Sequence, residues 1–210
     1  MTKFYFENSD EFYSSFAWKS ERQVLKDNHS YLLSVDEAND LNVEVFFSRG
    51  QNDAKPILNQ DYSFFAIPHE LDDLFFLDSI DGDCLSTVLA LANKYLTGTK
   101  YIASTDPRKC CVVETQELNE DVVWSLFSGH LNTPFLIFDI NRLVFILIDF
   151  DLPLQIFGSK LNRISIDEID FWREYVRKNW QAVVAQYSHY EMLDSIIRNY
   201  YSFIFGGRSG

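Results

Sequence analysis

Two apolar runs in the third quarter of the chain dominate its hydrophobic pattern. Residues 135–138 and 143–148 are apolar at every position, and the polar stretch 139–142 between them has the length of a hairpin turn. A strand with one exposed face alternates apolar and polar residues, so a continuously apolar strand is covered on both faces. We therefore predict a central hairpin in a sheet that lies under helices.

Apolar residues recur at helical spacing in three further regions. Residues 83–98 carry Leu85, Val88, Leu89, Ala92 and Leu96 on one stripe, and residues 119–129 form a shorter segment of the same kind. A third region begins with the capping-box spacing of Ser165 and Glu168. A break near Ser188 divides this last region, which predicts a C-terminal pair of helices.

The first third of the chain favours strands. Short apolar runs at 31–35, 43–47 and 62–67 alternate with polar stretches typical of turns, which predicts an antiparallel meander. A further strand is expected at 110–113. No linker or repeat divides the chain, so we expect one α+β domain over residues 1–205, with a mainly antiparallel sheet, and a flexible glycine-rich tail at 206–210.

Charge narrows the class of partner. The 210 residues contain 31 acids and 18 bases, a net charge of −13, so the overall field repels nucleic acids and anionic membranes and attracts cations. The apolar region 134–157 is interrupted by charged residues and is too short an apolar run for a membrane span. Three cysteines and the lack of a signal-peptide pattern lead us to expect a cytoplasmic protein.

The strongest candidate for partner binding is an acidic segment at 69–83. It holds Glu70, Asp72, Asp73, Asp78 and Asp81, has no Lys or Arg, and interleaves these acids with apolar residues. Steering charge beside apolar anchors is typical of protein-binding surfaces. The alternative is an amphipathic turn whose apolar residues face the core while the acids are solvated.

Aromatic residues add to this picture. They make up 16 % of the chain and gather near its C-terminal end, and Tyr is a common interface anchor. In acidity and aromatic content the chain resembles the immunity and antitoxin proteins that neutralise basic nuclease toxins. The resemblance is one of physical character and not of a motif. It implies a non-enzymatic inhibitor whose carboxylates occupy the places where a toxin's cations would hold substrate phosphates.

A second hypothesis starts from Cys84, which lies in the first turn of a predicted helix, where the helix dipole favours a thiolate. His130 and then Asp149, or Asp139, follow along the chain. This order resembles that of papain-like and transglutaminase-like cysteine hydrolases, and the resemblance implies a nucleophile, a base and an orienting carboxylate. The alternative is that Cys84 is a small core residue.

Metal and cofactor motifs are not recognisable. The acids near Asp81 do not follow the calcium-loop spacing, and no glycine-rich phosphate cradle occurs. The histidines have no ligand-spaced partner, and Asp149 with Asp151 is typical of a strand leaving the core. We therefore expect neither a metal nor a cofactor.

Overall fold

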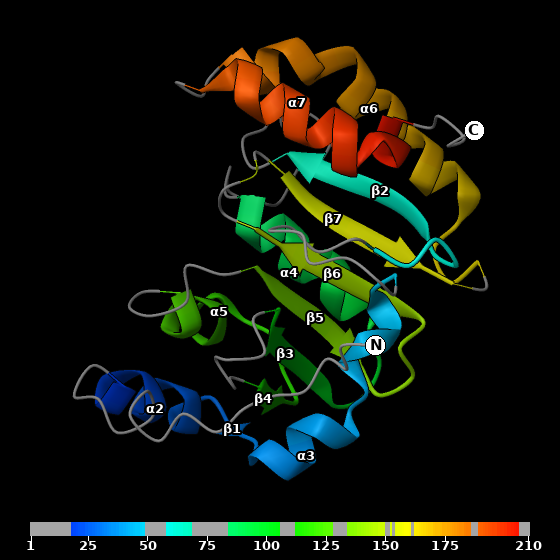
Figure 1. The fold of residues 1–210 in the computed structure, drawn as a ribbon. Helices are drawn as coiled ribbons and strands as arrows, with labels where there is room; N and C mark the ends of the chain where they lie inside the picture. The colour runs from blue at the N-terminus through cyan, green and yellow to red at the C-terminus, as the bar shows by residue number, and fades with distance from the viewer. Residues whose placement is uncertain are drawn as a thin grey trace.

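Seven strands form one antiparallel sheet in the order β1-β4-β3-β5-β6-β7-β2 (Figure 1). The computed structural model describes residues 18–48, 58–68, 84–105, 112–127, 134–149, 152, 154–160, 162–185 and 189–205. The strands are β1 Ser30–Leu32, β2 Ser63–Pro68, β3 Lys100–Ser104, β4 Val112–Thr115, β5 Phe135–Asp139, β6 Val144–Ile148 and β7 Leu154–Ser159. The predicted α+β domain with a mainly antiparallel sheet is confirmed.

Helices lie on both faces of this sheet. They are α2 Trp18–Asp27, α3 Val35–Asp40, α4 Cys84–Tyr95, α5 Glu120–Phe127, α6 Ile166–Ala185 and α7 Tyr190–Tyr200, with 3-10 turns η1 Val43–Phe46 and η2 Ser202–Phe205. One apolar cluster joins the sheet to α3, η1, η2, α7 and most of α6. The other cluster joins the opposite face to α2, α4, α5 and the start of α6. The sheet therefore separates two cores.

The predicted central hairpin is confirmed. β5 is the fourth of the seven strands and pairs with β6 in the register Ile137 to Ile146 and Phe138 to Phe145. Successive residues enter opposite cores, since Phe138 belongs to one cluster and Ile137 to the other. This division explains why residues 135–138 and 144–148 are apolar at every position.

Helix α6 covers the β2 edge of the sheet. Trp172 packs in one core and Val176 in the other, so the helix crosses the edge from one face to the other (Figure 1). Arg173 Nε donates a hydrogen bond of 2.8 Å to the carbonyl of Phe64 in β2. The edge strand β2 is thereby shielded, and one of its outward carbonyls is satisfied.

The predicted C-terminal helical pair is also confirmed. α6 ends at Ala185 and α7 begins at Tyr190, on either side of the predicted break. The Trp180 indole of α6 donates to the carboxylate of Asp194 in α7, and Arg198 pairs with the same carboxylate at 2.8 Å. The two helices are thus joined by a polar contact as well as by apolar packing.

The first third of the chain differs from its prediction. Residues 43–46 form the 3-10 turn η1 instead of a strand, because Val43 and Phe46, three residues apart, are both buried on one side of it. Residues 35–40 form α3 instead of a turn, since Ser34 and Glu37 make a complete capping box. The meander is also wrong, because β1 and β2 lie at opposite edges of the sheet.

A glycine in β7 makes room for an aromatic ring. Gly158 lies directly opposite Phe145 in β6 and Phe64 in β2. A Cβ atom added at Gly158 would lie 2.3 Å from Cε1 of Phe145, whose ring is fully buried. The missing side chain therefore allows the Phe145 ring to lie over the main chain of its neighbour.

We predict that Gly158→Ala lowers the free energy of unfolding by about 1–3 kcal/mol, because the Phe145 ring must move in a packed core. Chemical denaturation measures this loss. Phe145→Leu shortens the clashing side chain. In a protein that carries Phe145→Leu, Gly158→Ala should lower the free energy of unfolding by at least about 0.5 kcal/mol less than it does in the wild type. An equal cost in both backgrounds would show that the ring is not what excludes the methyl group.

Candidate functional site

The five carboxylates predicted to bind a partner are not placed. Glu70, Asp72, Asp73, Asp78 and Asp81 lie outside the described residues, which end at Pro68 in β2 and resume at Cys84 in α4. Their role stays a prediction. The structure does place acids of α3 and β4 beside the β1 edge of the sheet.

The hydrolase residues are placed only in part. Cys84 begins α4, as predicted, but its side chain and all of His130 lie outside the described part of the chain. Asp149 follows β6 and is buried, with 2 % of its surface exposed. The alternative carboxylate, Asp139, accepts hydrogen bonds from the main-chain N–H groups of Thr97 and Arg142, which gives it a structural role in closing the β5–β6 turn. A catalytic arrangement stays untested.

The β1 edge of the sheet presents main-chain groups outward. The Leu33 N–H donates to the Val112 carbonyl at 2.9 Å, and Leu32 lies opposite Val113. Because hydrogen-bonded pairs alternate along an antiparallel ladder, the N–H and C=O of Leu32 point away from β4. Within the described ranges, no hydrogen bond reaches either group. Among the described residues, this edge is therefore open at Leu32.

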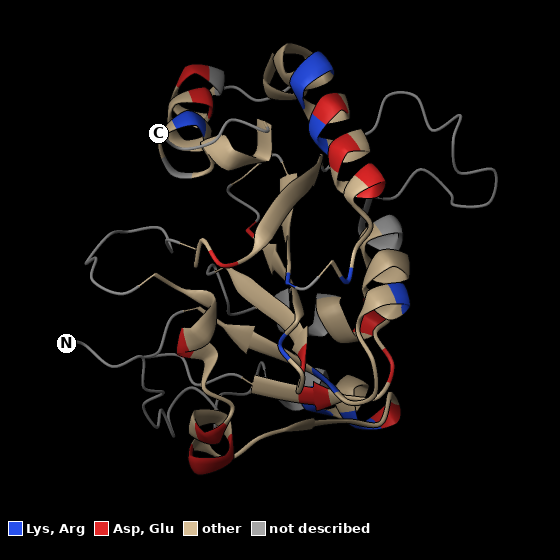
Figure 2. Cartoon of the chain, turned by 90° about the vertical axis from the view of Figure 1, so that its right-hand side faces the viewer, with Lys and Arg blue, Asp and Glu red and all other residues tan. Residues whose placement is uncertain are grey.

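Helix α3 follows β1 directly and adds acids beside it. Asp36 and Asp40 are exposed, and neither has an ion pair with a Lys or Arg of the described segments. Glu37 is used locally, because its hydrogen bonds to the hydroxyl and N–H of Ser34 hold the pKa of its carboxyl below the ordinary value. Figure 2 shows Asp and Glu residues in red at the lower end of the molecule, where α3 lies.

An exposed aromatic residue lies among these acids. Tyr31 in β1 is 58 % exposed and pairs with Glu114 in β4, which in turn pairs with Tyr101 in β3. Burial raises the pKa of Tyr101, and the charge and hydrogen bond of Glu114 raise it further. The three side chains share one face of the sheet.

Glu117 follows β4 at the end of the same strand pair and is exposed. The Glu117 carbonyl accepts a hydrogen bond from Thr115, whose hydroxyl also accepts one from Ser30 at the start of β1. The Asn119 side chain accepts from the Val122 N–H and so caps α5, which means that the acids nearby are not needed as caps. We define the acidic edge as β1 with Tyr31, Asp36, Asp40, Glu114 and Glu117.

The acidic edge was missed by sequence reasoning because it joins distant segments. Ser30 and Thr115, which meet through their hydroxyl groups, are 85 positions apart. The residues of α3 were predicted to form a turn, and no pattern in the sequence links them to Glu114. Only the pairing of β1 with β4 brings the two sets of acids together.

Comparisons with protein-family models, with curated proteins and with solved structures give no match to this chain. Within the described parts, no three His, Cys, Asp or Glu side chains are grouped as metal ligands. None of the helices that the structure describes is long and apolar enough to span a bilayer.

We predict that Glu114→Gln lowers the pKa of Tyr101 but leaves it above the ordinary value of 10.0, because burial, the larger cause, is retained. Because the folded state holds the Tyr101 proton more tightly, the fold is stabilised at any pH below the pKa that Tyr101 has in the unfolded chain. This stabilisation is lost as the pH rises through the pKa of Tyr101 in the folded protein. The variant should therefore lose this stabilisation at a lower pH than the wild type does. Tyrosinate absorbance, with Tyr101→Phe as the baseline, measures the pKa. An unchanged value would contradict the contact between the two side chains.

Proposed function

We propose that the protein is a non-enzymatic binding protein whose acidic edge takes up an extended segment of a basic partner as an added strand. The observation that carries this proposal is the outward N–H and C=O of Leu32, which no described residue satisfies. Strand addition uses such groups for affinity and the neighbouring side chains for specificity. In this protein the neighbouring side chains are acidic and aromatic.

Charge supports a basic partner. Asp36 and Asp40 lie on the helix that follows β1, without ion pairs in the described structure, and the whole chain carries a net charge of −13. Lys or Arg side chains at alternate positions of an added strand would all face one side of the sheet. Tyr31 would supply contact area and a face for cation–π contact.

Acids at a sheet edge have a second use, which is to prevent pairing between copies of the same chain. Repulsion between copies and attraction of a basic strand follow from the same charges. The two uses differ in what is bound. An edge that serves only to prevent pairing between copies binds neither an acidic nor a basic peptide strand. Binding of a defined basic peptide therefore separates them.

The narrower form of the proposal is an immunity-type inhibitor, in which the basic partner is a nuclease toxin domain and binding covers its phosphate-contacting cations. The excess of 31 acids over 18 bases supports this form. To test this form, the immobilised protein captures partners from a lysate at low salt, and raised salt then releases them for identification. Release of a basic nuclease that the pure protein then inhibits is the expected result, and a partner without net positive charge would contradict it.

We predict that Asp36→Asn with Asp40→Asn weakens binding of a peptide of alternating Lys and Thr by roughly twofold to thirtyfold, since exposed charge pairs contribute modestly. The wild-type affinity should fall as salt is raised, and the variant should depend less on salt. The matched control removes Asp167 and Glu191, two exposed acids on α6 and α7 at the far end of the sheet. An equal loss in the control would mean that net charge alone, and not the acidic edge, attracts the peptide.

We also predict that Leu32→Pro weakens binding of the same peptide by roughly tenfold or more, because it removes the outward N–H and leaves the bonds to β4 intact. Leu32→Val, which keeps the N–H, should bind within about twofold of wild type. Thermal unfolding checks that both variants fold. Should Leu32→Pro not fold, a peptide of the same composition interrupted by prolines takes its place, and binding of that peptide at wild-type strength would contradict strand addition.

The cysteine hydrolase remains an alternative proposal with no described geometry in its favour. Replacing Cys84 with Ala separates the two functions, because it abolishes a hydrolase and leaves peptide binding at the acidic edge unchanged.

A further inference from the structure

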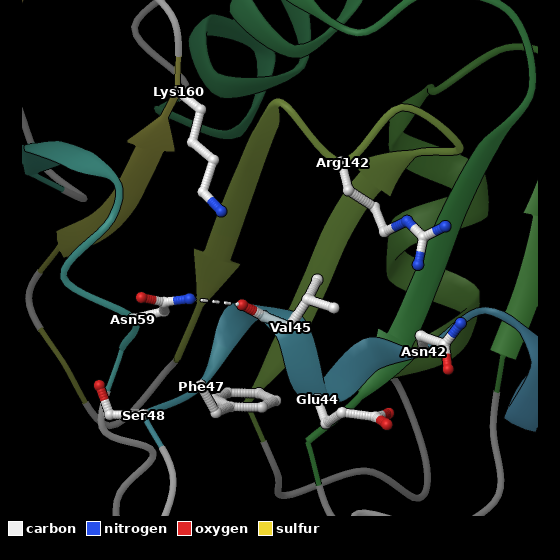
Figure 3. Close-up of a pocket in the computed structure, with 8 residues that line it drawn as sticks. All are labelled: Asn42, Glu44, Val45, Phe47, Ser48, Asn59, Arg142 and Lys160. Atoms are coloured by element: carbon white, nitrogen blue, oxygen red, sulfur yellow. Dashed lines mark hydrogen bonds between the residues drawn. The ribbon is translucent and has the colours of Figure 1, made fainter.

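A cavity of about 570 Å³ opens where the β5–β6 turn, the end of β7 and the η1 segment meet. This volume lies in the range of small-molecule sites, about 300–1,000 Å³. Arg142 and Lys160 extend into it from neighbouring strand ends, and Glu44, Val45 and Phe47 lie opposite them (Figure 3). The cavity shares no lining residue with the acidic edge, so its role does not rest on the function proposed above.

The charge of the cavity is opposite to that of the protein. Of the residues that line it, Arg142 and Lys160 are cationic and only Glu44 is anionic, in a chain with a net charge of −13. Neither cation pairs with Glu44 in the described structure, and the ion pair of Lys160 with the exposed Asp61 is long, at 3.9 Å. Cations that face a cavity without close counterions favour an anionic ligand.

Arg142 is held in a fixed position. Its Nη1 donates to the Leu41 carbonyl at 3.0 Å and its Nε to the Ile140 carbonyl at 3.3 Å. A guanidinium has five N–H donors, so three remain for a ligand. Its φ of 56° is unusual for Arg and is maintained by hydrogen bonds from its N–H to the side chain and carbonyl of Asp139. Strained backbone of this kind is concentrated at binding sites.

Tyr62 links the two cations. Its hydroxyl donates to the Arg142 carbonyl at 2.8 Å, and the Nζ of Lys160 lies 4.3 Å from the centre of its ring. Burial raises the pKa of Tyr62 to about 12, so the hydroxyl keeps its proton at neutral pH. The Lys160 N–H donates to the Leu143 carbonyl at 2.7 Å, which fixes the main chain that carries this side chain. Both cations are thus positioned before any ligand arrives.

The rest of the lining limits the ligand. Val45 and Phe47 supply apolar surface, while the Asn59 side chain is occupied by the Val45 carbonyl and the Asp61 N–H. The lining itself holds two cations and one carboxylate, and Asp61 pairs with Lys160 at 3.9 Å from outside it, so the site suits one oxyanion and disfavours a polyphosphate. We propose that the cavity binds a small organic oxyanion, a carboxylate or phosphate monoester on an apolar body, between Arg142 and Lys160.

Titration with phenylacetate and with phenyl phosphate, followed by NMR shifts of the cavity residues, tests the proposal on the full chain. At least one of the two should bind, and phenylacetamide, which lacks the charge, should bind at least about tenfold more weakly. The tighter of the two anions identifies the oxyanion as carboxylate or phosphate. The proposal would be overturned if phenylacetamide bound as tightly as the anions. It would also be overturned if neither anion bound at millimolar concentration.

Two substitutions assign the binding to the cavity. Arg142→Gly removes the guanidinium at a position whose φ suits glycine, and Lys160→Met keeps an apolar stem over the Tyr62 ring. Each should weaken anion binding about tenfold or more, as expected for the loss of a hydrogen bond to a charged group. Arg163→Met removes an exposed cation that does not line the cavity and should change nothing. Equal losses in all three variants would assign the binding to general surface charge and overturn the proposal.

Discussion

An open β-sheet has two edge strands, and the main-chain groups that face outward from each must find a partner or water. In this protein α6 lies along the β2 edge and Arg173 donates to the Phe64 carbonyl there. The β1 edge has no such cover among the described residues, and none of these residues forms a hydrogen bond with the outward groups of Leu32. The difference between the two edges is the basis of the proposed function, because within the described structure it leaves the β1 edge open to an added strand.

Both proposed sites depend on the rigidity of the sheet, and the acidic edge depends on its open edge strand as well. Strands that are buried on both faces, as β5 and β6 are, cannot slide without moving apolar side chains from one core to the other. Groups attached to the strand ends are therefore held at fixed separations. The cationic cavity lies at such strand ends, whereas the acidic edge runs along the edge strand β1 of the same sheet, and the two carry opposite charge. A basic macromolecule and a small anion would accordingly be directed to different places.

The parts of the fold that could be predicted were those with a strong local pattern. The central hairpin followed from its uninterrupted apolar runs, and α4, α6 and α7 followed from helical spacing and caps. The pattern failed at 43–46, where alternating apolar residues are also compatible with a 3-10 turn that buries Val43 and Phe46. It could not place β1 against β4, because this pairing joins segments far apart in sequence and depends on tertiary packing. The positive φ of Arg142 carries no sequence signal at all, since arginine is not a residue that favours it.

The central claim is that the main chain of Leu32 is free to receive a partner strand, and amide hydrogen exchange tests it most directly. In the free protein the Leu33 amide, which donates to Val112, should be protected, while the Leu32 amide should exchange quickly. Addition of the alternating Lys–Thr peptide should slow exchange at Leu32 and leave Leu33 unchanged. A Leu32 amide that is already protected in the free protein, or that still exchanges quickly when the peptide is bound, would contradict the account.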